Sequence, residues 1–296
     1  MSQKQLHSLL RHIYSNHPIH IFSEPLQDWA SSHTRFGAAL SLGKFTDEVL
    51  CMTHFKRTTK IGLLAFGILV LAAVSSAETC PPAAEKIAKA YGIESFGQID
   101  AVRSTFNIDF PGLKAAQSWT WEPKADRVTY EGKDKAGNPV KVTYVRSQLS
   151  SQPDDVKKID AGFNNNQYWL WLPFHACWDT AAKVEDTGMH KLPLGGGSAR
   201  RVVMKYPPEV GGYTPGDTWE MYVGPDNRIQ QLTWRLGPGA KNIVSLVNAK
   251  WLNYKRAGPL LVALDHRGTG DGKPLRIFFT DVAVKLAGSD TWLPAQ

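Results

Sequence analysis

Hydrophobic and polar positions alternate with a period of two along much of residues 102–286. In the first such segment, polar residues separate Val102, Phe106, Ile108 and Phe110. Successive side chains of a strand point to opposite faces of a sheet, so this pattern predicts strands with one buried face. The same pattern, bounded by turn residues, predicts further strands around 119–121, 128–130, 140–144, 201–206, 218–223, 229–236, 248–254, 260–266 and 275–286.

Two segments break the alternation and predict helices. The first is Ala83–Tyr91, which follows two prolines and stops at Gly92. The second begins near residues 151–155, where a proline and two acidic residues are typical of a first helical turn. We expect this second helix to continue through Phe163–Phe174 and to be ended by Pro173.

No internal repeat and no linker divides residues 78–296. One antiparallel sheet with inserted helices is the simplest arrangement of these elements. The sequence therefore predicts a single α+β domain over residues 78–296.

A leader sequence precedes this domain. Three basic residues between positions 56 and 60 are followed by the apolar run Ile61–Val74 and then by Ser75-Ser76-Ala77. This order is typical of a secretory signal peptide, here residues 52–77, which we expect to be cleaved after Ala77. The apolar run is shorter than the roughly 20 residues that span a bilayer, so an uncleaved signal anchor is the weaker interpretation. The mature protein would then be periplasmic or secreted, without a stable membrane span.

Residues 1–51 differ from the rest of the chain and contain five of its nine histidines. They show no sustained period and no low-complexity pattern. Our hypothesis is that Met52 is the true start, because signal peptides begin near the start of a chain. The alternative is a tail that precedes a signal anchor.

Charge changes the set of plausible partners. Residues 1–77 contain seven of the 34 Lys and Arg and four of the 27 Asp and Glu, which leaves a net charge of about +4 on the mature domain. These charges are scattered, with no run of five like signs. That pattern is typical of a solvated surface, so we expect no nucleic-acid partner.

Two cysteines, Cys80 and Cys177, lie in the mature domain. In an oxidising compartment they could form a disulfide that ties the N-terminal segment to the domain. Spacing alone leaves this pairing open.

Motifs for metal, cofactor or catalytic chemistry are missing from the sequence. His175, Cys177 and His190 fit no zinc-ligand spacing, and neither GxxxxGK[ST] nor GxGxxG occurs. Asp217 and Glu220 lie three residues apart near a strand start, where side chains point to opposite faces. We therefore predict no catalytic residues, no metal and no cofactor.

Tryptophan is the most prominent feature, with nine of the ten residues in the mature domain. Core packing accounts for most of them, but some could line a cavity for an apolar ligand or a sugar. Two of them, at positions 169 and 171, cannot both face the sheet from one helix. The candidates for cavity-lining residues are Trp119, Trp121, Trp169, Trp171, Trp219 and Trp234.

The order of elements resembles a known superfamily. A signal peptide and a short helix precede the segments Phe106–Phe110 and Trp119–Pro123, and the hairpin Asp217–Ile229 follows later. This layout resembles the periplasmic lipoprotein carriers of LolA and LolB type over most of residues 83–286. The resemblance implies an incomplete (half) barrel, with helices that cover the concave face of a curved antiparallel sheet and an apolar cavity that holds acyl chains.

We therefore predict an exported, non-enzymatic protein that binds a lipid, an acylated protein or another apolar molecule. One alternative is an envelope protein that binds or hydrolyses glycans, with carboxylates such as Asp179, Asp217 and Glu220. Another is a structural domain that docks a partner through exposed tryptophans.

Overall fold

A computed structural model describes residues 80–133, 138–208, 215–238, 240, 242 and 244–296. The predicted leader, its cleavage site and residues 1–51 lie outside the described residues.

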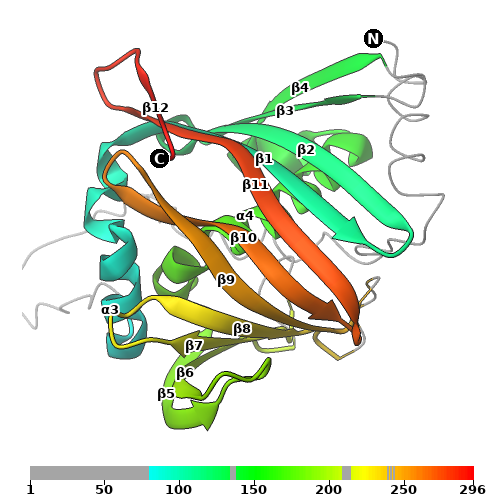
Figure 1. The fold of residues 1–296 in the computed structure, drawn as a ribbon. Helices are drawn as coiled ribbons and strands as arrows, with labels where there is room; N and C mark the ends of the chain where they lie inside the picture. The colour runs from blue at the N-terminus through cyan, green and yellow to red at the C-terminus, as the bar shows by residue number, and fades with distance from the viewer. Residues whose placement is uncertain (1–79, 134–137, 209–214, 239, 241, 243) are drawn as a thin grey trace, which may run out of the picture. The chain divides into compact units, whose positions relative to one another are not determined.

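The sheet is long, curved and antiparallel, and it does not close into a barrel (Figure 1). Its order is β4-β3-β2-β1-β11-β10-β9-β8-β7-β6-β5, and β12 pairs with β11. Within the described residues the two edges of this path are therefore β4 and β5. The strands are β1 (Ile99–Phe110), β2 (Leu113–Glu122), β3 (Arg127–Lys133), β4 (Pro139–Val145), β5 (Lys183–Lys191), β6 (Ser198–Lys205), β7 (Thr218–Val223), β8 (Ile229–Arg235), β9 (Leu246–Ala257), β10 (Leu260–Gly270), β11 (Lys273–Leu286) and β12 (Trp292–Pro294).

The pairing of β1 with β11 joins two meanders into this one sheet. Strands β1 to β4 form the first meander and β5 to β11 the second, each with neighbours in chain order. Register runs from Ile99 opposite Leu286 to Asp109 opposite Arg276. The pairing therefore sends β4 and β5 to opposite edges, although only one connection in the chain separates them.

That connection contains the α-helix α4 (Asp154–Trp178). Its N-terminal half packs with β2, β3 and β4 in a core cluster that includes Trp119, Tyr130 and Phe163. Its C-terminal half belongs to the larger cluster, with side chains from the strands β6 to β11. A single helix thus contributes to both halves of the hydrophobic core.

The shorter helix α3 (Pro82–Tyr91) begins and ends as predicted. Gly92 ends it with φ of 92°, a left-handed conformation that favours glycine. A Cβ at this position would lie 2.7 Å from the carbonyl oxygen of Pro259, so the close approach to the β9–β10 turn also requires glycine.

Two predictions about the elements are wrong. Pro173 does not end α4, which continues to Trp178 with non-helical dihedral angles at Trp171 (φ −115°, ψ 17°). Proline removes one N–H and crowds the carbonyl four residues earlier, which bends a helix when packing holds both halves in place. The strand β5 was not predicted, because most of its residues are exposed on both faces and show no alternation.

A disulfide joins Cys80 to Cys177, with the Cα atoms 4.5 Å apart. It connects the start of α3 to the last turn of α4 across 97 residues of sequence. A cross-link over such a long segment restricts the unfolded chain strongly.

We expect the double variant Cys80→Ser/Cys177→Ser to lose about 2–5 kcal/mol of unfolding free energy, because the unfolded chain regains its freedom. Urea unfolding of wild type and variant measures the difference. As a control, peptide mapping of wild-type protein labelled while denatured without reductant should find both cysteines unlabelled, and labelling of either would argue against the bond.

Candidate functional site

The C-terminal half of α4 places one indole against the inward side chains of the central strands. The ring centroid of Trp169 lies 5.5 Å from that of Trp219, 6.2 Å from Trp251 and 5.9 Å from His266. Cross-strand register sets Trp251 opposite His266 and Trp219 opposite Trp234. We call these five side chains the aromatic interior.

Three of the six predicted cavity residues, Trp169, Trp219 and Trp234, therefore come together. Trp119 lies in the other core cluster, 4.9 Å from the ring of Tyr130. The remaining two contact Phe96, which lies in the 3-10 helix η1 (Ile93–Gln98), at 5.6 Å for Trp121 and 6.0 Å for Trp171. As expected from helical geometry, the indoles at positions 169 and 171 contact different parts of the fold.

These tryptophans do not line an open cavity in this structure. Five of the six are at most 6% exposed, and Trp121 is partly buried. Their rings pack against protein atoms, so the space between α4 and the sheet is filled. No tryptophan is among the exposed large hydrophobic residues of the described segments.

Polar atoms without partners lie inside this apolar packing. Among the described residues, Trp219 Nε1 is buried with no hydrogen-bond partner, and neither ring nitrogen of His266 has a partner with good hydrogen-bond geometry, although the backbone carbonyl of Trp169 lies near the imidazole. Outside the aromatic interior, Trp171 Nε1 and Gln167 Oε1 are also buried without a partner among the described residues. A buried polar group without a partner costs about 1–3 kcal/mol relative to a satisfied one, so these groups mark the places in the interior where a ligand hydrogen bond would stabilise the protein.

His266 is a neutral imidazole in this environment. Burial lowers the pKa of His266 to about 3, although the Asp265 charge and the backbone carbonyl of Trp169 act in the opposite direction. That carbonyl has lost its helical partner, because residue i+4 is Pro173, which has no N–H. The break in α4 and the buried histidine thus belong to one local arrangement.

A polar cluster holds the end of α4 next to the aromatic interior. Asp179 accepts hydrogen bonds from Tyr206 and from Tyr168 (2.6 Å), and its carboxylate lies 3.1 Å from Nδ1 of His175. Burial acts to raise the pKa of Asp179, but the charge and hydrogen bond of His175 and the two tyrosine hydroxyls hold it below the usual value. The cluster fixes the helix end to the residue after β6.

The three carboxylates of the glycan alternative have separate partners. Asp217 accepts from Trp234 Nε1 (2.9 Å) and from a backbone amide, while Glu220 on the opposite face pairs with Arg201 and Arg235. Asp179 is engaged as described above. Glycan hydrolysis requires two carboxyl groups that face one cleft. Among the described residues, no hydrogen-bond partner is shared by two of these three carboxylates, so no such pair is seen.

In residues 80–296, apart from the gaps named above, no three His, Cys, Asp or Glu side chains are grouped to hold a metal ion. No helix in this part of the chain has the length and apolar character to cross a membrane.

Comparison with known proteins gives distant structural neighbours. No family model matches the sequence, and no curated protein matches it. A DUF1329 family protein from Desulfovibrio piger aligns with TM-score 0.39 and 8% identity, covering 72% of this chain and 96% of its own. A putative outer membrane lipoprotein-sorting protein domain from Vibrio parahaemolyticus aligns with TM-score 0.38 and 11% identity, over 70% and 95% of the two chains. The lipoprotein LppX of Mycobacterium tuberculosis aligns with TM-score 0.26 and 6% identity, over 68% and 94%.

Two of these neighbours are described as a lipoprotein or a lipoprotein-sorting protein, the class of protein that the sequence resembles.

Sequence reasoning missed two residues of the aromatic interior, Trp251 and His266. Both occupy inward positions of the alternation in segments that were predicted as strands. A histidine at an inward strand position was the available signal. The contact of His266 with Trp169 could not be predicted from the sequence, because it depends on how α4 lies relative to the sheet.

We expect the neutral His266 to make stability pH-dependent. The unfolded histidine binds a proton below about pH 6.5, whereas the folded one stays neutral to about pH 3. Unfolding free energy should therefore decrease as pH falls from 7 to 5, by about 2 kcal/mol from this group. Urea unfolding across this range measures it.

The variant His266→Phe should lack this contribution, while His190→Gln, a change at a β5 histidine outside the aromatic interior, should retain it. Equal pH dependence in wild type and His266→Phe would show that the imidazole is not buried as described.

Proposed function

We propose that this protein is an exported, non-enzymatic binding protein that holds an amphipathic ligand between α4 and the inner face of the sheet. The observation that carries the proposal is the set of buried, unpartnered polar atoms inside the aromatic interior. In this proposal the sheet is a half-barrel, α3 and α4 cover its concave face, and the ligand takes the place of the Trp169 indole.

The walls of the aromatic interior suit an apolar body. Trp219, Trp234 and Trp251 present large ring surfaces, and each buried tryptophan removes on the order of 150–250 Å² from water. An acyl chain or another apolar group in contact with these rings would gain a similar benefit, about 25 cal/mol for each Å² that it buries.

The break in α4 gives this interior a place to open. Trp171 has non-helical dihedral angles and Pro173 cannot donate to the preceding turn, so the helix is weakest beside Trp169. Its C-terminal end is held by the disulfide at Cys177 and by the Asp179 cluster. Movement of Trp169 is therefore the smallest change that would uncover Trp219 and His266.

The polar atoms define the head group of the ligand. Trp219 Nε1 is a donor, and a neutral imidazole offers one donor and one acceptor. Neither supplies a positive charge at neutral pH, so the group that fits is an uncharged acceptor such as an ester or amide carbonyl. A lipid ester or the acyl linkage of a modified protein has this chemistry.

We expect Trp169→Ala to bind a neutral apolar fluorescent probe, N-phenyl-1-naphthylamine, more tightly than wild type, because the variant opens the space that the indole fills. The same change should cost about 3–5 kcal/mol of stability. Probe titration and urea unfolding measure the two effects.

The matched control is Trp292→Ala, a tryptophan of β12 that stacks on Arg103 outside the aromatic interior. Equal probe binding by the two variants would argue against a ligand space beside Trp169, and Trp169→Leu provides a milder change if the alanine variant unfolds.

We also expect a neutral acyl ester to co-purify with the protein or to load from a lipid extract. Native mass spectrometry of protein isolated from cells that express the full chain, followed by organic extraction, identifies it. The double variant Trp219→Phe/His266→Phe keeps the apolar walls and removes the polar atoms, so it should retain markedly less ester. Retention equal to wild type would exclude the proposed head-group contacts.

A further inference from the structure

The outer face of the sheet carries a row of cations at the level of the β10–β11 hairpin. Register places Lys250 opposite Arg267 and Arg267 opposite Arg276. The row continues through Asp109 to Lys114 on β2. Like charges directly opposite each other on adjacent strands are destabilising, so this arrangement calls for a compensating anion.

The protein supplies only part of that compensation. Asp265 accepts from Arg276 through Nε (2.9 Å) and Nη2 (3.2 Å), and from Arg267 through Nε (2.7 Å). Burial acts to raise the pKa of Asp265, but these hydrogen bonds hold it below the usual value, so the carboxylate stays charged. The row therefore contains four cations, two of lysine and two of arginine, and two carboxylates, Asp109 and Asp265. Its net charge is +2.

Both guanidinium groups keep donors for a further partner. Each arginine has five N–H groups, and no acceptor other than Asp265 hydrogen-bonds to Arg267 or Arg276 among the described residues. Their side chains are 58% and 41% exposed. The side chain of Asp265 is only 9% exposed, and it orients two accessible guanidinium groups of the type that bind phosphate oxygens.

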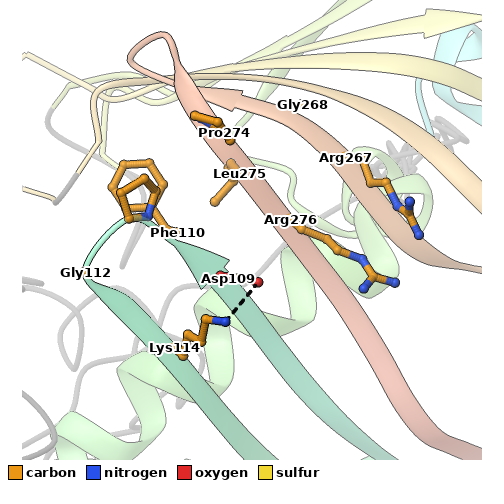
Figure 2. A pocket seen from close by; sticks show the side chains of 10 residues that line it. Asp109, Phe110, Gly112, Lys114, Arg267, Gly268, Pro274, Leu275 and Arg276 are labelled. Carbon is orange, nitrogen blue, oxygen red and sulfur yellow. Dashed lines mark ion pairs between the residues drawn. The ribbon is translucent and has the colours of Figure 1, made fainter.

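These residues border a depression of about 430 Å³ (Figure 2). Lys114, Arg267 and Arg276 form its charged rim, while Phe110, Pro274 and Leu275 contribute apolar surface from the β1–β2 and β10–β11 hairpins. The volume lies within the usual range for small-molecule sites. Guanidinium groups beside apolar side chains suit a ligand that has an anionic group at one end and an apolar part next to it.

We propose that this depression is a docking site for the phosphate head group of an anionic lipid at a membrane surface. Its three cations lie on the face opposite the aromatic interior, because His266 and Arg267 are successive residues of one strand, whereas the Phe110 and Leu275 side chains that line it belong to the inner core cluster. The site is therefore independent of the internal ligand site, and either can fail without the other.

The test is co-sedimentation of the full-length protein with vesicles of phosphatidylcholine alone or of phosphatidylcholine mixed with phosphatidylglycerol. We expect binding only to the anionic vesicles, and weaker binding as ionic strength rises. A basic residue near such a surface contributes about 1 kcal/mol, or roughly fivefold in affinity. Arg267→Gln/Arg276→Gln should thus bind on the order of 25-fold more weakly.

A second variant avoids disturbing Asp265. Lys114→Gln/Lys250→Gln removes two exposed cations of the row, of which Lys114 pairs with Asp109 at 3.6 Å. Lys183→Gln/Lys191→Gln is the matched control on β5, with the same change in net charge and one comparable pair, Lys183 with Glu185 at 2.6 Å. The first variant should lose binding as the arginine variant does, and the control should not.

Three outcomes would overturn the proposal. If the β5 control variant lost as much vesicle binding as the other variants, net charge alone would explain the effect. If the protein bound neutral and anionic vesicles equally, recognition of the head group would be excluded. Binding of inorganic phosphate to the protein together with no binding to the anionic vesicles would identify a free-anion site instead.

Discussion

The pairing of β1 with β11 is the constraint on which the rest of the structure depends. It joins residues near 99–110 to residues near 276–286, so two meanders become one sheet. It also sends β4 and β5 to opposite edges, and α4 must cross between them. The helix is about 37 Å long, while ten strand spacings measure about 48 Å along the sheet. A curved sheet shortens that crossing, which is consistent with one helix serving both core clusters.

The helix α4 carries a break in its hydrogen bonding into the hydrophobic core. Pro173 breaks the hydrogen-bond ladder where the helix is most deeply buried, and the carbonyl of Trp169 is left facing His266. The disulfide at Cys177 and the Asp179 cluster hold the far end of the helix. The break in the helix and the buried histidine beside it therefore lie just before a firmly attached helix end. Local strain and unpaired polar groups of this kind are common at sites that bind ligands.

Strand alternation separates two chemistries across the thickness of one sheet. His266 lies among indoles and is neutral, whereas Arg267, the next residue, is exposed and charged. On the inner face the surroundings favour an uncharged group, and on the outer face they favour an anion. A protein that docks on an anionic membrane and carries a neutral acyl ester would need these two surfaces, and the sheet keeps them apart.

The sequence by itself determined the local elements, because they depend on periodicity and on turn residues that act over a few positions. It gave most of the strands, α3 with its stop at Gly92, and the separation of Trp169 from Trp171 on one helix. Only the tertiary structure decided the rest. The edge strand β5 shows no alternation because both of its faces are largely exposed, and α4 passes Pro173 because packing on both sides holds it. Which indoles meet, and that His266 lies beside Trp169, follows from the β1–β11 pairing, a contact between segments about 170 residues apart that leaves no local pattern in either.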